Sequence, residues 1–208
     1  MVDRAYNFAA GPAVMPEPVL KRASSEMLNW HGCGMSVMEM SHRGSQFAEI
    51  YSEAKERFKR LLGVPDTHEV LFLQGGATAQ FAAIPLNLMD GRGADYAVTG
   101  NFSGIAAREA AKYGSVHIAY EGKGNGYTHI PTQSELDVDG ASAYFHYCAN
   151  NTIFGTAWDY VPETKGVPLV CDMSSEIMSH PVDVSRYALI YAGAQKNIGP
   201  AGLCIVIV

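Results

Sequence analysis

Two residues near the end of the chain have types and positions that could support chemistry. Lys196 stands in "YAGAQKNIGPAG", residues 191–202, among small residues and between apolar runs at 188–192 and 203–208. A buried ammonium without a partner is costly, so this lysine needs a partner charge, access to solvent or a covalent role. Asp172 directly follows another short apolar run, residues 169–171. A lysine and a carboxylate at two predicted strand ends form the first candidate site.

This pair suits pyridoxal 5′-phosphate. The amine of Lys196 would form a Schiff base with the cofactor aldehyde, and Asp172 would keep the pyridine nitrogen protonated so that the ring acts as an electron sink. Two structural alternatives stand beside this interpretation. Lys196 could be a surface lysine in a turn, and Asp172 could cap the next element, since Ser174 and Ser175 follow it.

A small-residue segment, "QGGATAQF" at 74–81, lies between a predicted strand and a predicted helix. Small residues allow the backbone to approach a ligand, and the N-terminus of a helix offers free N–H groups to a phosphate. The alternative is a tight strand-to-helix turn. The segment lacks both the P-loop lysine and the dinucleotide-binding glycine spacing, so neither of those sites is expected. Phe102, in a second such connection, could stack on a cofactor ring.

The elements that must position these residues follow from periodicity. Helical spacing marks residues 18–30, 46–62 and 81–89, and a loop and helix are expected over 100–114. Repeated strand, loop and helix units predict an α/β fold with a mainly parallel (mixed) sheet and helices on both faces. The predicted strands span residues 69–73, 96–98, 116–120, 143–148, 169–171, 188–192 and 203–208. Ligands of such sheets bind beyond the carboxyl ends of the strands, where the candidate residues fall.

Composition limits the function classes. The 208 residues are 48% hydrophobic and 17% charged with a net charge of −6, and no basic stripe supports nucleic-acid binding. No apolar run is long enough for a membrane helix, and no secretory signal is expected. The four cysteines form no C-x-x-C pair, which favours free thiols and a cytoplasmic location. No metal site is expected.

The domain organisation is expected to be an N-terminal arm at 1–16 followed by a large cofactor-binding domain at 17–208. The chain ends within "GLCIVIV", an apolar strand without a following turn signal. Because an exposed apolar strand invites aggregation, we expect the sequence to be part of a longer protein.

Several segments, in this order, resemble the phosphoserine aminotransferase family, which comprises fold-type I (class V) enzymes that use pyridoxal phosphate. The resemblance covers essentially the whole chain. The segments are "NFAAGPAVMP", "SVMEMSHRG", "QGGATAQFAAIPLNL", "ADYAVTGNFS", "FHYCANNTIFG", "VCDMSS" and "PVDVSRYALIYAGAQKNIGPAGLCIVIV". The resemblance implies the fold-type I large domain with a seven-stranded sheet, without the C-terminal small domain.

The resemblance also implies roles for individual residues. Lys196 and Asp172 would be the catalytic pair, and Phe102 would stack on the ring, at a position where tryptophan is common in the family. Arginine is bidentate to anions, so Arg43, beside His42, would bind the anionic side group of the substrate, with an exposed loop salt bridge as the alternative. The implied cofactor-binding residues are Gly76, Ala77, Thr78, Phe102, Thr152, Asp172, Gln195 and Lys196.

The implied reaction is amino transfer between L-glutamate and 3-phosphohydroxypyruvate, which gives O-phospho-L-serine and 2-oxoglutarate. The resemblance also implies a homodimer, and it extends to a related step with 4-phosphohydroxy-L-threonine in pyridoxine biosynthesis. Two alternatives stay open. The first is another class V enzyme, of the serine or alanine-glyoxylate aminotransferase type. The second is a non-catalytic fragment that binds the cofactor or a partner.

Overall fold

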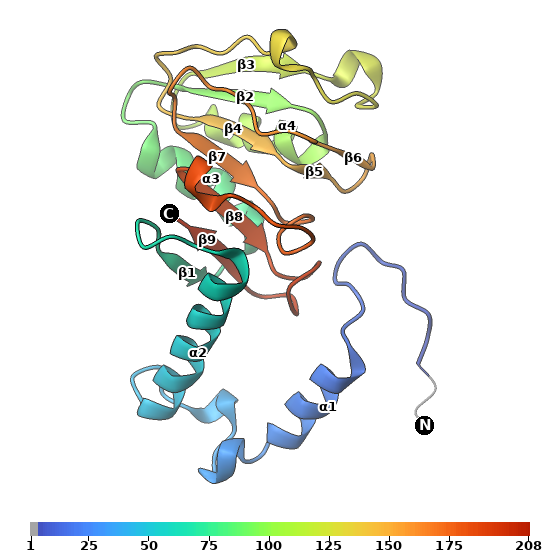
Figure 1. Cartoon of the computed structure of the whole chain (residues 1–208), viewed down its shortest axis with the longest axis vertical. Coiled ribbons are helices and arrows are strands. Elements are labelled where there is room, and N and C mark those ends of the chain that lie inside the picture. Colours follow the sequence, from blue (N-terminus) through green and yellow to red (C-terminus); the bar gives the residue numbers. More distant parts are fainter. Residues whose placement is uncertain (1–3) are drawn as a thin grey trace.

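A seven-stranded mixed sheet forms the centre of the protein, as a computed structural model that describes residues 4–208 shows (Figure 1). The strand order is β1-β9-β8-β7-β4-β2-β3. Strands β2, β3, β4, β7 and β8 run parallel, whereas β9 is antiparallel to both β1 and β8. The strands are β1 (Val70–Leu73), β2 (Ala94–Val98), β3 (Val116–Glu121), β4 (Phe145–Cys148), β7 (Leu169–Asp172), β8 (Leu189–Gly193) and β9 (Cys204–Ile207). All seven predicted strands and the mixed character of the sheet are confirmed.

The central strands are buried along their whole length. Every residue of β2, β4, β7, β8 and β9 is buried. Such continuous apolar runs are typical of strands that are covered on both faces. Two bounds differ from the prediction by two residues: β2 begins earlier, at Ala94, and β4 begins later, at Phe145, although Ala143 and Tyr144 are buried as well. The other strand bounds agree with the prediction to within one residue.

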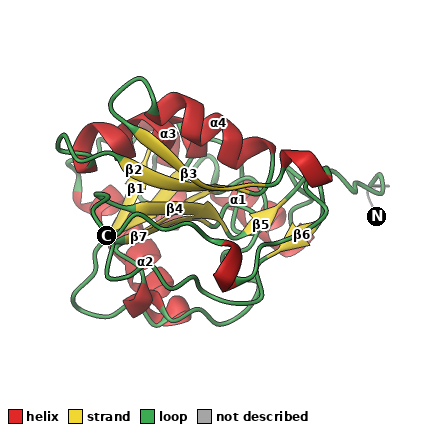
Figure 2. Ribbon diagram, turned by 90° about the horizontal axis from the view of Figure 1, so that it is seen from above, coloured by secondary structure: helices red, strands yellow, loops and turns green. Residues whose placement is uncertain are grey.

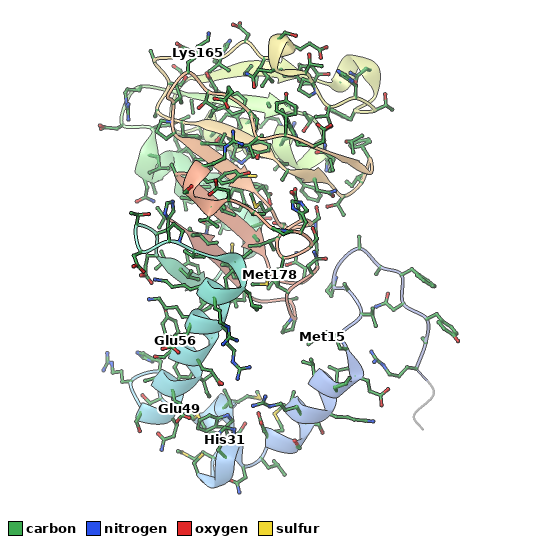
Figure 3. All side chains as sticks on the ribbon, viewed as in Figure 1. Met15, His31, Glu49, Glu56, Lys165 and Met178 are labelled. Carbon is green, nitrogen blue, oxygen red and sulfur yellow. The ribbon has the colours of Figure 1, made fainter. Side chains whose placement is uncertain are left out.

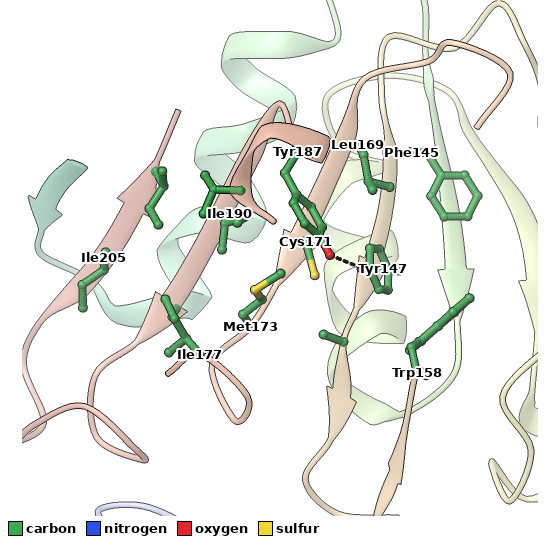
Figure 4. Close-up of a cluster of buried hydrophobic side chains, with 14 of the residues drawn as sticks. Phe145, Tyr147, Trp158, Leu169, Cys171, Met173, Ile177, Tyr187, Ile190 and Ile205 are labelled. Carbon is green, nitrogen blue, oxygen red and sulfur yellow. Dashed lines mark hydrogen bonds between the residues drawn. The ribbon is translucent and has the colours of Figure 1, made fainter. Parts of the chain in front are cut away.

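Different kinds of structure cover the two faces of the sheet. Helices α3 (Gly76–Leu88) and α4 (Asn101–Ala110) pack on one face (Figure 2). The other face is covered by the C-terminal end of α2 (Ser45–Leu62), the 3-10 helix η5 (Val184–Arg186) and irregular segments. Figure 4 shows the core on this second face, where the hydroxyl groups of Tyr147 and Tyr187 share a hydrogen bond of 3.1 Å.

Helix α3 begins five residues before the segment predicted from periodicity. Gly75, its N-cap, has a φ of 88°, a left-handed conformation that favours glycine. A Cβ at this position would lie 2.5 Å from the Cβ of Ala79, so a larger residue cannot fit without a shift. The segment from Gly76 to Thr78 therefore forms the first turn of a helix and not a loop before it.

The N-terminal part is loosely attached to the sheet. Helix α1 (Glu17–Glu26) ends four residues earlier than predicted and has no buried residue. Residues 4–16 contain no helix or strand, as expected for an arm, and residues 1–3 of the predicted arm lie outside the described residues. One arm contact reaches the other end of the chain, where the N–H of Ala13 donates to the carbonyl of Gln195 (2.8 Å).

The remaining elements are short. The sequence did not indicate the small β5–β6 hairpin, whose strands have two residues each. The short elements are the hairpin strands β5 (Asn150–Asn151) and β6 (Thr156–Ala157) and the 3-10 helices η1 (Trp30–Gly32), η2 (Val37–Glu39), η3 (Lys123–Asn125) and η4 (Gln133–Glu135). All four cysteines are free thiols. Within residues 4–208, no helix has the length and apolarity to cross a bilayer, and no cluster of potential ligands could hold a metal ion.

Candidate active site

One cavity of about 140 Å³ brings together the residues that the sequence predicted for a cofactor. It opens where α3 and α4 begin and where β7 and β8 end, at the carboxyl edge of the parallel strands. Its lining includes all eight predicted residues: Gly76, Ala77, Thr78, Phe102, Thr152, Asp172, Gln195 and Lys196. A larger cavity of about 250 Å³ lies on the opposite face, but its lining contains no lysine, so it offers no amine for covalent chemistry.

Lys196 points into this cavity from the turn between β8 and β9. Its Nζ donates to Oγ1 of Thr152 (2.6 Å) and lies 5.5 Å from the ring centroid of Phe102. Burial lowers the pKa of Lys196, while Asp172 and Cys148 act in the opposite direction. A lysine held in this way is closer to its neutral, nucleophilic form than an exposed lysine.

Asp172 ends β7 and is only 7% exposed. Its Oδ1 accepts hydrogen bonds from the N–H (2.9 Å) and the hydroxyl (2.6 Å) of Ser174. Burial raises the pKa of Asp172, and the bonds from Ser174 and the charge of Lys196 oppose this effect. These bonds agree with the capping alternative, since the aspartate organises the turn that follows β7, and Asp172 lines the cavity as well.

The first turn of α3 provides an anion site on the wall of the cavity. The first helical bond runs from the N–H of Ala79 to the carbonyl of Gly75 (3.2 Å). The N–H groups of Gly76, Ala77 and Thr78 have no hydrogen-bond partner within residues 4–208. Together with the hydroxyl of Thr78 and the positive end of the helix dipole, these donors suit a phosphate group.

Some lining residues were not predicted from the sequence. Cys148 and Asn150 come from the end of β4 and the residues after it, and the hydroxyl of Ser175 donates to Oδ1 of Asn150 (2.9 Å). Ser174 was considered only as a residue near a cap. Their position after buried strands was the available signal, but polar residues at strand ends are too common to single them out.

The two predicted substrate-binding residues do not line this cavity. His42 and Arg43 are exposed on the loop before α2. Figure 3 labels His31 and Glu49, which lie on either side of this loop in the sequence, at the end of the α1–α2 segment that is distant from the sheet. The role of His42 and Arg43 stays a prediction.

A comparison with protein families agrees with this arrangement. The model of the family described as aminotransferase class-V matches residues 5–208. The chain belongs to the class-V aminotransferase family.

Individual relatives of this class-V aminotransferase carry a more specific name. The chain is 54% identical over 204 residues to the phosphoserine aminotransferase of Laribacter hongkongensis, which covers 98% of this chain and 56% of that protein. It is also 54% identical over 209 residues to the phosphoserine aminotransferase of Pseudomonas fluorescens, with 100% and 58% covered. The chain therefore spans just over half the length of the curated relatives it matches.

Solved structures confirm the fold of this class-V aminotransferase. The phosphoserine aminotransferase of Bacillus circulans subsp. alkalophilus superposes with a TM-score of 0.95 at 45% identity and covers 99% of this chain and 57% of that chain. The PLP-bound phosphoserine aminotransferase of Trichomonas vaginalis gives a TM-score of 0.90 at 39% identity, with 99% and 58% covered. The seven-stranded sheet thus belongs to the fold of these structures, of which the chain covers just over half the length.

Proposed function

We propose that the protein is a phosphoserine aminotransferase that uses pyridoxal phosphate. The reaction moves the amino group between L-glutamate and 3-phosphohydroxypyruvate and gives O-phospho-L-serine and 2-oxoglutarate. The observation that carries the proposal is the meeting of Lys196, Asp172 and the free N–H groups of α3 in one cavity. The names of the relatives support the choice of substrate.

The donor set of the cavity fits this cofactor. The first turn of α3 would hold the phosphate through backbone N–H groups and the Thr78 hydroxyl, with help from Gln195. Phe102 would stack on the ring, and Asp172 would pair with the protonated ring nitrogen. Thr152, which accepts the bond from Lys196, would bond the ring hydroxyl.

The residues of the chain would then work in sequence. When bound, pyridoxal phosphate supplies an electron sink for negative charge at the substrate Cα. Lys196 would hold the cofactor covalently. Its neutral Nζ, favoured by burial, would also act as the base that takes the proton from the substrate Cα and as the acid that returns it. Asp172 would keep the ring nitrogen protonated throughout.

His42 and Arg43 would bind the anionic side group of the substrate. Because they do not line the cavity of their own chain, we assign them to the cavity of a second copy in a homodimer. The exposed apolar residues of the arm and the following segment support such a partner, since Phe8 is 92% and Leu28 is 85% exposed. The free cysteines favour a reducing location such as the cytoplasm.

The first test is the visible absorbance of the protein with pyridoxal phosphate. We expect a band that depends on Lys196, so Lys196→Ala should remove it and abolish turnover. Lys123→Ala, a change in η3 outside the cavity, is the matched control and should keep both properties. A band that persists in Lys196→Ala together with full activity would overturn the proposal.

The substrate is tested separately by steady-state kinetics. We expect kcat/KM for 3-phosphohydroxypyruvate to exceed that for glyoxylate and pyruvate by about two orders of magnitude, because a desolvated anion site discriminates strongly against substrates without the charge. A preference for glyoxylate would instead assign the protein to another class V activity. A normal band without any turnover would mean that the 208 residues form a cofactor-binding unit only.

A further inference from the structure

A chain of buried polar side chains lies behind Asp172, beneath α3. Tyr191 is the neighbour of Asp172 in the pairing of β7 with β8, and its hydroxyl is 2.8 Å from Nε2 of His146 on β4. Burial raises the pKa of Asp172, and the Tyr191 hydroxyl is among the groups that oppose this effect. Tyr191 is 0% and His146 is 1% exposed, so bulk water does not reach this chain.

The protonation of His146 follows from its surroundings. Burial lowers its pKa to about 3, so the imidazole is neutral at pH 7 and carries one N–H. Its Nδ1 has no hydrogen-bond partner within the described residues, and the ring stacks on Tyr96 at a centroid distance of 4.7 Å. A buried N–H without an acceptor is rarer than a buried acceptor without a donor. The proton therefore belongs on Nε2, which faces the Tyr191 oxygen.

The protonation of His146 determines where the proton of the Tyr191 hydroxyl can point. If the Tyr191 oxygen accepts from Nε2–H, its own proton is free to point at the nearest strong acceptor. We take that acceptor to be the Asp172 carboxylate, because Asp172 and Tyr191 are paired across β7 and β8, and a hydrogen bond to a charged group is about twice as strong as a neutral one. Lys196, Cys148 on β4 and Cys204 on β9 also face Asp172, but the two thiols are weak donors.

We propose that His146 and Tyr191 are positioning residues that hold Asp172 as a carboxylate, with His146 Nε2–H donating to Tyr191 and Tyr191 donating to Asp172. This inference rests on the proposed role of Asp172 as the partner of the ring nitrogen. An ionised aspartate is needed there, because a protonated one would leave the ring nitrogen without its counter-charge. Neither positioning residue lines the cavity, so they act only through Asp172.

The test compares the affinity for pyridoxal phosphate across four variants of the full chain. Tyr191→Phe removes the donor to Asp172 and should raise the Kd about tenfold, as expected for the loss of one hydrogen bond to a charged group. His146→Leu should have a similar effect, whereas His146→Gln keeps an N–H donor and should restore most of the affinity. Tyr96→Phe is the matched control, because its buried hydroxyl bonds to Tyr144 and not to this chain (2.7 Å), and its Kd should not change.

A second measurement does not depend on the cofactor. The ¹⁵N NMR shifts of the His146 side chain in the cofactor-free protein should show a neutral imidazole with its proton on Nε2. A proton on Nδ1, or a Tyr191→Phe variant that binds pyridoxal phosphate as tightly as Tyr96→Phe, would overturn the inference. If the wild-type protein does not bind pyridoxal phosphate at all, the proposed function fails, while the NMR shifts still decide how the chain is protonated.

Discussion

The ionisable groups of the cavity are held in surroundings that disfavour their charged forms. Burial raises the pKa of Asp172 and lowers the pKa of Lys196. Both effects oppose the ion pair that the two groups could otherwise form, and neither is fully offset by hydrogen bonds. Burial of these two ionisable groups therefore lowers the stability of the folded chain.

Replacement of the aspartate should reveal this cost. We expect Asp172→Asn to stabilise the cofactor-free protein at neutral pH, because the amide keeps the acceptor for Ser174 without a buried charge. A gain of about 1 kcal/mol would raise Tm by about 2–4 °C in a chain of this length. The same variant should bind pyridoxal phosphate weakly. Thermal unfolding monitored by circular dichroism measures the first effect.

The stability difference between Asp172→Asn and the wild-type protein should depend on pH, with a sign that follows from the raised pKa of Asp172. A carboxyl group whose pKa is raised on folding costs stability wherever the unfolded chain would ionise it. The cost is therefore absent below its ordinary value of 3.8, grows as the pH rises and is full above its folded pKa. The advantage of Asp172→Asn should thus shrink as the pH falls toward that value. Asp66→Asn, at an exposed position, is the control. Equal Tm values for Asp172→Asn and wild type at pH 7 would contradict the prediction.

Individual residues were predictable from sequence where their chemistry is unusual. A lysine between two apolar runs and an aspartate after a third stood out, and both line the cavity. His146 and Tyr191 did not stand out, because both sit within strand-like runs. Only the register of β4, β7 and β8 brings them onto the face of the sheet that carries Asp172.

At the scale of elements, the start of α3 matters most for the site. The left-handed conformation of Gly75 turns the chain from β1 into the helix, so that its first N–H groups face the cavity. The loss of this conformation would misplace the predicted phosphate donors, even though Gly75 itself does not line the cavity.

Gly75→Ala should therefore damage both stability and cofactor binding. The left-handed conformation alone costs an alanine about 1–2 kcal/mol, and contact with the Cβ of Ala79 should add to this cost. Urea unfolding measures the change in the free energy of unfolding. Gly91→Ala is a matched control, since Gly91 also has a positive φ (76°) but has no atom within 4 Å of an added Cβ. If the two variants lose equal stability, the contact with Ala79 is not the cause.

The strands could be predicted because each is a continuous apolar run that the sheet buries. Helix α1 was predicted to continue to residue 30 from its spacing, but it ends at Glu26, since no part of the described chain packs on it to extend it. The start of α3 was missed because two glycines usually indicate a loop. Local sequence does not show that the left-handed Gly75 starts the helix and leaves Gly76 in its first turn.

At the scale of the whole molecule, the assignment of Arg43 to a second copy can be tested with mixed dimers. Arg43→Ala and Lys196→Ala should each be inactive as homodimers. When equal amounts are mixed and allowed to exchange, half of the dimers are mixed, and each of these has one site with both residues intact. We expect about a quarter of the wild-type activity to return.

Activity that does not return after exchange would mean that Arg43 serves the cavity of its own chain. An active Arg43→Ala homodimer would mean that Arg43 does not bind the substrate. Sedimentation velocity on the mixture shows whether dimers are present, so that a failure to associate is distinguished from a wrong assignment. A mixture of Lys123→Ala with Lys196→Ala serves as the control, because its Lys123→Ala subunits should be active without exchange.

The position of β9 between β1 and β8 has a consequence for how the protein is made. A ribosome releases β1 before the other six strands and β9 after them, so β1 has no neighbour in the sheet until β9 has emerged. The turn with Lys196 and the contact between Ala13 and Gln195 also wait for this segment. The parallel strands from β2 to β8 can pair earlier, but contacts across such sequence separations form slowly. The candidate cavity is thus completed only when the segment from the Lys196 turn to β9 joins elements that were synthesised long before it.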